Sequence, residues 1–247
     1  MAGEILRRFA AVQDAAQRRE ILAEWVRKRS DVEIAGALAG VARAAVRRNP
    51  VALQVVLAWI VLTIAPRNPV IRRERSLFRH AEAAGEPLLV TLLQPPFPVV
   101  QPETPLARVL LGRGGRPLTL GERRAAARKS DRFLLDRLLS DPDPGVVARL
   151  LRNPALTERE AVRIAAWRPG RAEVLIEVLR AFRWSVRPVV QAALARNPAM
   201  PPEVATRLTL LLPAPKLREI LRDSEAQLLV RIACRRQIDA IGRTRRR

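Results

Sequence analysis

A short phrase that recurs in the second half of the chain constrains the fold more than any other feature. Residues 153–157 read Asn-Pro-Ala-Leu-Thr and residues 197–201 read Asn-Pro-Ala-Met-Pro, so the two copies stand 44 positions apart. An earlier copy begins at Leu118-Thr119, 38 positions before Leu156-Thr157. A period of about 40 residues is typical of helical repeat proteins, in which each repeat buries its apolar face against its neighbours.

The residues around each copy carry the chemistry of helix ends. Thr119 with Glu122, and Thr157 with Glu160, have the spacing of capping boxes, which satisfy backbone amides of a first helical turn. The third copy has prolines at 201–202, and proline is favourable at the first helical position. Each Arg-Asn-Pro predicts a helix end, because arginine complements the helix dipole, asparagine tolerates a left-handed C-cap and proline prevents continuation. Middle helices are predicted at residues 133–139, 174–180 and 216–222.

These copies resemble HEAT or armadillo repeats. The segments RNPALT and RNPAMPPEV are similar in sequence to the variant leucine-rich (LRV-type) helical repeats of bacterial proteins. The resemblance covers residues 118–240 and implies an α-solenoid, a superhelix of stacked helices. Some variant-repeat proteins also carry a cysteine-ligated iron–sulfur domain, which the single cysteine of this chain, Cys234, excludes.

The composition and the positions of proline and glycine predict four parts of the chain. These are an N-terminal helical segment (1–82), a proline-rich connection (83–117), the HEAT-like repeats (118–240) and a basic tail (241–247). Ile5 and Phe9 begin a helical spacing of apolar residues in the first part. Ser30-Asp31 predicts the start of a further helix, and Asn49-Pro50 predicts its end. Prolines exclude a regular helix from residues 94–105.

One segment lacks charge altogether. The fifteen residues between Pro50 and Pro66 contain no charged side chain. A membrane-spanning helix needs about 20 apolar residues, so this segment is short for a span, and we expect a buried central helix. Contact of this helix with lipid is the alternative. The N-terminus has charges every few residues and no apolar run typical of a signal peptide, so we expect a cytoplasmic protein.

The composition favours helices and a strong positive charge. Aromatic residues make up 4% of the chain and tyrosine is absent, so the core consists of Leu, Val, Ile and Ala. The net charge is +21, and all but three of the 45 basic residues are arginines. Such a charge favours a polyanionic partner, which is a nucleic acid, an acidic protein face or, less favoured, an anionic membrane surface. The same composition is typical of a GC-rich genome, which is the alternative explanation.

Four arginines in equivalent positions are the first candidates for partner binding. In the 44-residue frame Arg152 corresponds to Arg196, and Arg163 corresponds to Arg207. Stacked repeats would align each pair into a ladder of cations that suits phosphates or carboxylates. The alternative is that Arg152 and Arg196 only complement helix ends, while Arg163 and Arg207 belong to a solvated helix face.

Two tryptophans are further candidates. Some HEAT-like proteins are alkylpurine DNA glycosylases, which combine a basic concave face with aromatic residues and a catalytic aspartate. The resemblance would assign these roles to Trp167 and Trp184 and to one of Asp131, Asp136 and Asp223, although the spacing selects none of the three. Packing in the core or between repeats is the alternative role of the tryptophans.

The remaining chemistry is sparse. One histidine, His80, and one cysteine leave no catalytic triad and no zinc site of the usual kind, and we expect Cys234 to be buried and inert. The sequence therefore predicts an all-α, non-catalytic binding or scaffold protein without cofactor, small-molecule substrate or transmembrane span. Its expected partner is an acidic protein or a nucleic acid. A DNA- or RNA-binding protein and, less favoured, the DNA glycosylase remain the alternatives.

Overall fold

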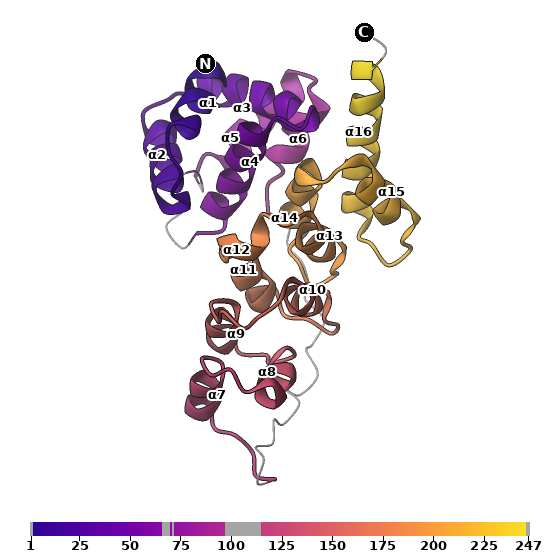
Figure 1. The fold of residues 1–247 in the computed structure, drawn as a ribbon. Helices are drawn as coiled ribbons and strands as arrows, with labels where there is room; N and C mark the ends of the chain where they lie inside the picture. Colours follow the sequence, from indigo (N-terminus) through magenta and orange to yellow (C-terminus); the bar gives the residue numbers. More distant parts are fainter. Residues whose placement is uncertain (1, 66–69, 71, 97–114, 246–247) are drawn as a thin grey trace. The chain divides into compact units, whose positions relative to one another are not determined.

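The computed structural model describes residues 2–65, 70, 72–96 and 115–245, with side chains to residue 243. All regular elements of these residues are helices, which confirms the predicted all-α class (Figure 1). The chain forms two compact units. Unit 1 comprises Met1–Phe97 and Pro202–Arg247, and unit 2 comprises Pro98–Pro201.

This division corrects the predicted domain boundaries. The sequence predicts one repeat domain over residues 118–240, but the part after Pro201 packs with the N-terminal helices in unit 1. The reason lies in the leucine-rich segment 208–212, four leucines and Thr209, which is buried against α3, α4 and α6. The period of a repeat does not reveal which neighbouring helices cover its last copy.

Six helices form the N-terminal part of unit 1: α1 (Ala2–Ala10), α2 (Ala15–Arg27), α3 (Asp31–Val46), α4 (Pro50–Thr63), α5 (Glu74–Ala83) and α6 (Pro87–Leu92). Ser30 and Glu33 form a complete capping box at the start of α3. Asn49 accepts a hydrogen bond from the amide of Ala52 and begins α4, so Asn49-Pro50 is a helix start as well as the end of the preceding helix.

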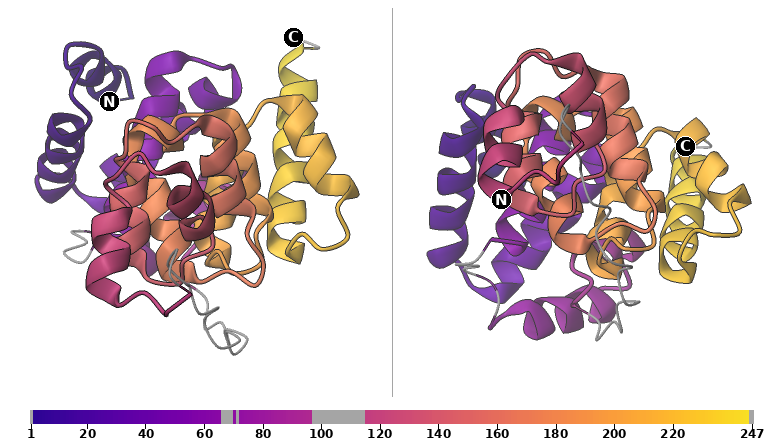
Figure 2. Two further views of the ribbon diagram at one scale, coloured as in Figure 1. Left: turned by 60° about the horizontal axis from the view of Figure 1, so that its bottom comes forward. Right: turned by 90° about the horizontal axis from the view of Figure 1, so that it is seen from below.

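The uncharged segment forms α4, the central helix of unit 1. Its residues Val55–Ile60 are all buried, and α4 packs against α2 and α3. A helix that is apolar on all sides needs cover from several neighbours, and α1, α2 and α3 all pack against α4, while Leu53 and Val61 stay half-buried. Figure 2 gives two further views of the helices. None of the helices in the described part of the chain is long and apolar enough to cross a membrane.

The C-terminal part of unit 1 contains α14 (Pro202–Leu208), the 3-10 helix η1 (Thr209–Leu211), α15 (Ala214–Arg222) and α16 (Leu228–Arg245). Helices α14 and α16 both contact α6, and α14 also contacts α4. The segment after unit 2 therefore completes the core that the first six helices begin.

Arg207 of α14 joins the two parts of unit 1. Its guanidinium donates to the hydroxyl of Thr63 at 2.7 Å and to the carbonyl of Gln94 at 2.6 Å. The residue is 2% exposed. Burial lowers the pKa of Arg207, while the negative charges of Glu74 and Glu203 oppose that change. The expectation that Arg207 lies on a binding surface is therefore wrong.

Arg48 supplies a second link inside unit 1. It is the one non-glycine residue of the described ranges with a positive φ, 63°, and it stands between α3 and α4. Its guanidinium donates to the carbonyl of Leu211 in η1 at 2.6 Å. The left-handed conformation expected of the asparagine in Arg-Asn-Pro is thus taken here by the arginine before it.

Unit 2 contains α7 (Leu120–Ala126), α8 (Arg132–Leu138), α9 (Pro144–Leu151), α10 (Glu158–Ala166), α11 (Ala172–Arg180), α12 (Phe182–Ser185) and α13 (Pro188–Arg196). Both predicted capping boxes, at Thr119 and Thr157, are present with their reciprocal bonds. We name residues 119–156 the first module and residues 157–200 the second module. In the first module α7 packs on α9, and in the second module α10 packs on α13 (Figure 1). The two modules contact each other through α9 and α11.

An asparagine clamp closes each module. The side-chain amide of Asn153 donates to the carbonyls of Ala127 and Lys129, both at 2.9 Å, just after α7. Asn197 donates in the same way to Ala165 at 2.9 Å and to Trp167 at 3.0 Å, at the end of α10. The amide oxygen of each asparagine also accepts from the backbone two residues later.

The clamp corrects the predicted role of Asn-Pro. Asn197 has φ −77° and ψ 122°, an extended conformation, so it is no left-handed cap. Both asparagines are almost fully buried. A side-chain amide offers two donors and an acceptor, and each clamp uses all of them on backbone groups that would otherwise be buried without partners.

Two further boundaries differ from expectation. Part of the predicted connection 83–117 is helical, because Pro87 stands at the first position of α6, where no amide donor is needed. Most of the remaining connection lies outside the described residues. The predicted basic tail is also helical as far as Arg245, where α16 ends.

We predict that Asn153→Asp destabilises the fold by about 2–3 kcal/mol, because a carboxylate cannot donate to the carbonyls of Ala127 and Lys129. Denaturant unfolding measures the change. Asn49→Asp is the matched control, since aspartate caps a helix as well as asparagine does, and it is expected to leave the stability within about 0.5 kcal/mol. Equal losses in both variants would contradict the clamp.

We also predict that Arg207→Met lowers the free energy of unfolding by about 3 kcal/mol, because it removes the buried donors to the hydroxyl of Thr63 and the carbonyl of Gln94. Arg163→Met, at the corresponding position of the sequence frame, removes only an exposed ion pair and costs less than about 1 kcal/mol. Thermal and denaturant unfolding of the two variants compare these effects. A small loss for Arg207→Met would show that the anchor is dispensable.

Candidate functional site

The predicted ladder of arginines is only partly present. Arg152 is the exposed C-cap of α9, Arg196 is the half-buried last residue of α13, and Arg163 is exposed on α10. The guanidinium of Arg163 is bound to the carboxylate of Asp136 on α8 at 2.6 Å. Arg207 lies buried in unit 1, so three of the four residues remain in unit 2.

One of the three, Arg152, lines a shallow pocket that we name the arginine pocket. Its volume is 460 Å³, and it is lined by Arg128, Ala148, Arg149, Arg152, Asn153 and Pro154. Arg128 follows the end of α7, while Arg149 and Arg152 stand in the last turn and at the C-cap of α9. The clamp of Asn153 holds these two helix ends together, so it also brings the three guanidinium groups to one place.

The charges in the pocket are largely unsatisfied by the protein. The Nη1 of Arg149 donates to the carbonyl of Gly145 at 2.7 Å. Arg128 and Arg152 are exposed, and their side chains make no hydrogen bond or ion pair with any other described residue. Guanidinium groups with free donors are the preferred protein ligands for carboxylate and phosphate.

Most other arginines of unit 2 differ from these in having acidic partners. Ion pairs within 4.0 Å join Arg116–Glu122, Arg123–Asp141, Arg124–Asp143, Arg132–Glu160, Arg163–Asp136, Arg171–Glu173, Arg180–Glu177 and Arg187–Glu158. Their net contribution to the local field is therefore small. In the arginine pocket, Arg128 and Arg152 without acidic partners lie together with Arg149, whereas the exposed Arg159, which also has no acidic partner among the described residues, lies outside it.

The second module shows that the packing does not require arginines here. The matching clamps align Arg128 with Ala166, since each follows the first carbonyl bound by the asparagine. Arg149 aligns with Ala193 at the same distance before the clamp asparagine. Only Arg152 has a counterpart arginine, Arg196. Arg128 and Arg149 are therefore specific to the pocket, because the second module packs in the same way with alanine at both positions.

Trp184 is a packing residue. It is 4% exposed, and its indole Nε1 donates to the carbonyl of Leu151 at 2.7 Å. Arg183 stacks over the indole at 4.3 Å and donates to the carbonyls of Asn153 and Leu156, both at 3.2 Å. The pair ties α12 to the loop after α9, so the proposed contact of Trp184 with a partner is wrong.

Trp167 is 40% exposed at the end of α10, and its carbonyl is bound by the second clamp. The aspartates considered for a glycosylase serve the fold. Asp131 caps α8, and Asp136 binds Arg163, whereas Asp223 belongs to unit 1 and not to unit 2. Trp184 is buried and two of the three aspartates hold the fold together, so these described residues give no support to the glycosylase alternative, which stays a prediction.

Other reactive groups also have structural roles. Asp141 is buried, where desolvation raises its pKa, and it binds Arg123 through both oxygens at 2.6 and 2.7 Å. Burial raises the pKa of Cys234 to about 12, so its thiol is unreactive at neutral pH. The described residues contain no group of His, Cys, Asp or Glu side chains that could hold a metal ion.

Sequence reasoning missed Arg128 and Arg149. A signal existed for Arg149, because it precedes Arg152 by three residues and so shares its helix face. Arg128 had none, since only the fold of the first module brings the end of α7 to α9. No family model matches this chain, and the comparisons with curated proteins and with solved structures find no match either.

We predict that Arg128→Ala and Arg149→Ala, alone or together, change the free energy of unfolding by no more than about 0.5 kcal/mol. The second module already carries alanine at both aligned positions. Urea unfolding of the double variant tests this. A loss comparable to that of Asn153→Asp would mean that the arginines hold the module together, and would assign them a structural role.

Proposed function

We propose that this chain is a non-catalytic binding protein, in which HEAT-like repeats of unit 2 present the arginine pocket to an acidic segment of a partner protein. The observation that carries the proposal is the convergence of Arg128, Arg149 and Arg152 on one pocket, two of them at positions where the next module has alanine. Charge that packing does not need, and that acidic neighbours do not neutralise, is best explained by a ligand.

The matching modules support the HEAT-like interpretation. Each begins with a capping box, contains a middle helix and closes with an asparagine clamp, and α9 of the first packs on α11 of the second. An α-solenoid of such modules exposes the ends of successive helices along one side. The arginine pocket lies at two such ends, where a segment of a partner could reach it without entering the core.

An acidic protein segment suits the pocket better than nucleic acid does. A nucleic acid needs a continuous track of unpaired cations along its phosphates. On unit 2 such a track is interrupted by the acidic partners of the arginines, among them the exposed Asp136 and Glu158. A pocket of 460 Å³ accommodates a few carboxylate side chains.

Nucleic acid remains the second candidate, on the strength of the net charge of +21. Non-specific binding to a polyanion follows from such a charge even without a built site, and it falls steeply with added salt. The two candidates therefore differ in whether particular arginines matter.

We predict that a fluorescein-labelled peptide of alternating glutamate and alanine binds the full chain, and that Arg128→Ala with Arg149→Ala weakens this binding about tenfold, by loss of charge-assisted hydrogen bonds. Fluorescence anisotropy at physiological salt measures the affinity. The control, Arg159→Ala with Arg187→Ala, removes the same charge from exposed positions outside the pocket and is expected to change the affinity less than about twofold.

Equal weakening by both double variants would show a response to net charge alone and would contradict the pocket. Labelled duplex DNA and single-stranded RNA are titrated in parallel. If either binds more tightly than the peptide at physiological salt and loses affinity in the pocket variant, the nucleic-acid function replaces the one proposed. If the chain binds none of the three probes, both proposals fail.

A further inference from the structure

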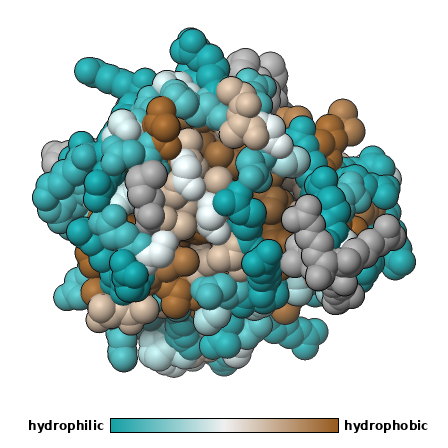
Figure 3. Space-filling view, turned by 90° about the horizontal axis from the view of Figure 1, so that it is seen from above, coloured by the Kyte–Doolittle hydropathy of each residue, from teal (hydrophilic) through white to brown (hydrophobic). Residues whose placement is uncertain are grey.

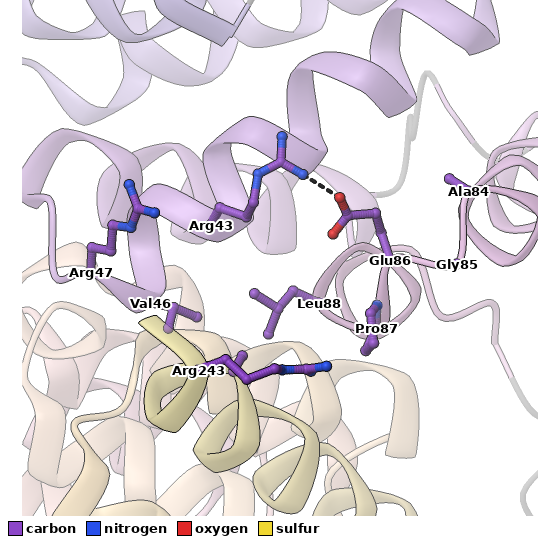
Figure 4. A pocket seen from close by; sticks show the side chains of 10 residues that line it. Arg43, Val46, Arg47, Ala84, Gly85, Glu86, Pro87, Leu88 and Arg243 are labelled. Atoms are coloured by element: carbon purple, nitrogen blue, oxygen red, sulfur yellow. Dashed lines mark hydrogen bonds and ion pairs between the residues drawn. The ribbon is translucent and has the colours of Figure 1, made fainter. Parts of the chain in front are cut away.

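Unit 1 contains a second basic cleft, separate from the arginine pocket. The end of α3, the turn between α5 and α6, and the last turns of α16 enclose 630 Å³ (Figure 4). This volume lies within the range of about 300–1,000 Å³ that holds small organic molecules. Its main lining residues are Arg43, Val46, Arg47, Glu86, Leu88 and Arg243.

An ion pair fixes one wall of the cleft. Arg43 of α3 binds the carboxylate of Glu86 in the turn before α6. The turn reaches this position because Gly85 adopts a φ of 60°, which ends α5 and aims the next residue toward α3. Glu86 precedes α6 but its side chain makes no capping bond there, so its carboxylate is committed to Arg43.

Two other guanidinium groups in the cleft have no such partner. The side chains of Arg47 and Arg243 make no hydrogen bond or ion pair with any described residue. Arg47 is the C-cap of α3 and Arg243 lies near the end of α16, so the fold brings like charges from distant parts of the chain to one cleft. Like charges gathered around a cleft repel each other and attract an anion.

An apolar floor separates the two charges. Figure 4 shows Val46 and Leu88 between the arginines of α3 and Arg243 of α16. Leu88 is 6% exposed and Val46 is 7% exposed, so the floor is firmly packed from below. Figure 3 shows one face of the molecule, where hydrophobic side chains reach the surface among hydrophilic ones.

We propose that this cleft binds a small organic dianion whose two acidic groups are separated by an apolar segment. Arg47 binds one acidic group and Arg243 the other, each by charge-assisted hydrogen bonds. The apolar segment lies over Val46 and Leu88, the part of the cleft wall between the two cations that carries no charge. The Arg43–Glu86 pair adds no net charge, so two free cations face two anions.

The site is independent of the function proposed for unit 2. All its residues belong to unit 1, and the arginine pocket lies entirely in unit 2. The two proposals therefore succeed or fail separately.

Isothermal titration of the full chain with α,ω-dicarboxylates, from adipate to dodecanedioate, tests the proposal. The affinity is expected to rise to a maximum at the chain length that joins the two arginines. The monomethyl ester of the best diacid keeps the length and the apolar segment but has one charge fewer. We expect it to bind about tenfold more weakly, because one charge-assisted contact is lost.

Arg47→Gln and Arg243→Gln are each expected to abolish this tenfold preference for the diacid over its ester. The control Arg231→Gln removes an exposed, unpartnered arginine from the same helix as Arg243, outside the cleft, and leaves the preference unchanged. Arg47→Lys keeps the charge and is expected to retain part of the preference. Circular dichroism verifies that each variant remains helical.

Three outcomes would overturn the proposal: no diacid binds more tightly than its ester, the preference persists in both glutamine variants, or Arg231→Gln removes it equally. The corresponding bisphosphates extend the test to the other common acidic group. Tighter binding of a bisphosphate, lost in the same two variants, supports the dianion site with phosphate as its acidic group.

Discussion

The guanidinium of Arg207 occupies the place where the two separate parts of unit 1 meet. One of its hydrogen bonds goes to Thr63 at the end of α4, and the other goes to the carbonyl of Gln94 beyond α6. A buried cation tolerates few geometries, because a displacement breaks these two hydrogen bonds in a region that water does not reach. The last helices of the chain are therefore held against the first ones, and the cleft between α3, α6 and α16 exists only because of that arrangement.

Unit 2 uses a neutral device for a similar purpose. The two asparagine clamps tie the end of one helix to the loop after another, with three hydrogen bonds each. Around these clamps Arg183 and Trp184 bind the loop from the second module. Buried polar groups that satisfy one another completely specify a single packing, whereas leucines and alanines alone would tolerate several.

Both proposed binding sites are inferred from arginines that have no acidic partner among the described residues. Most arginines of unit 2 are ion-paired or bind carbonyl oxygens, so a high net charge alone says little about where a partner binds. Arg128 and Arg152 in one unit, and Arg47 and Arg243 in the other, are exposed in hollows and have no side-chain partner among the described residues. In each case the hollow is made by segments that are separated in sequence, so the sequence suggested Arg152 but not its grouping with Arg128, nor that of Arg47 with Arg243.

Local chemistry was predictable from the sequence. The capping boxes at Thr119 and Thr157, the start of α3 at Ser30, and the burial of the uncharged α4 all depend on residues close together in the chain. Hydrogen bonds between a cap and its own first turn, and the apolar character of a single helix, need no knowledge of distant neighbours.

Only the tertiary structure decided which residues in equivalent sequence positions are buried and which are exposed. Arg163 and Arg207 share a position in the 44-residue frame, yet the first is exposed and ion-paired while the second is the buried anchor of unit 1. Likewise Trp184 is covered, and Arg128 meets Arg149 through the clamp of Asn153. A repeat in sequence determines the helices and their caps, but burial depends on which helices cover each surface, and that is set by contacts across the whole chain.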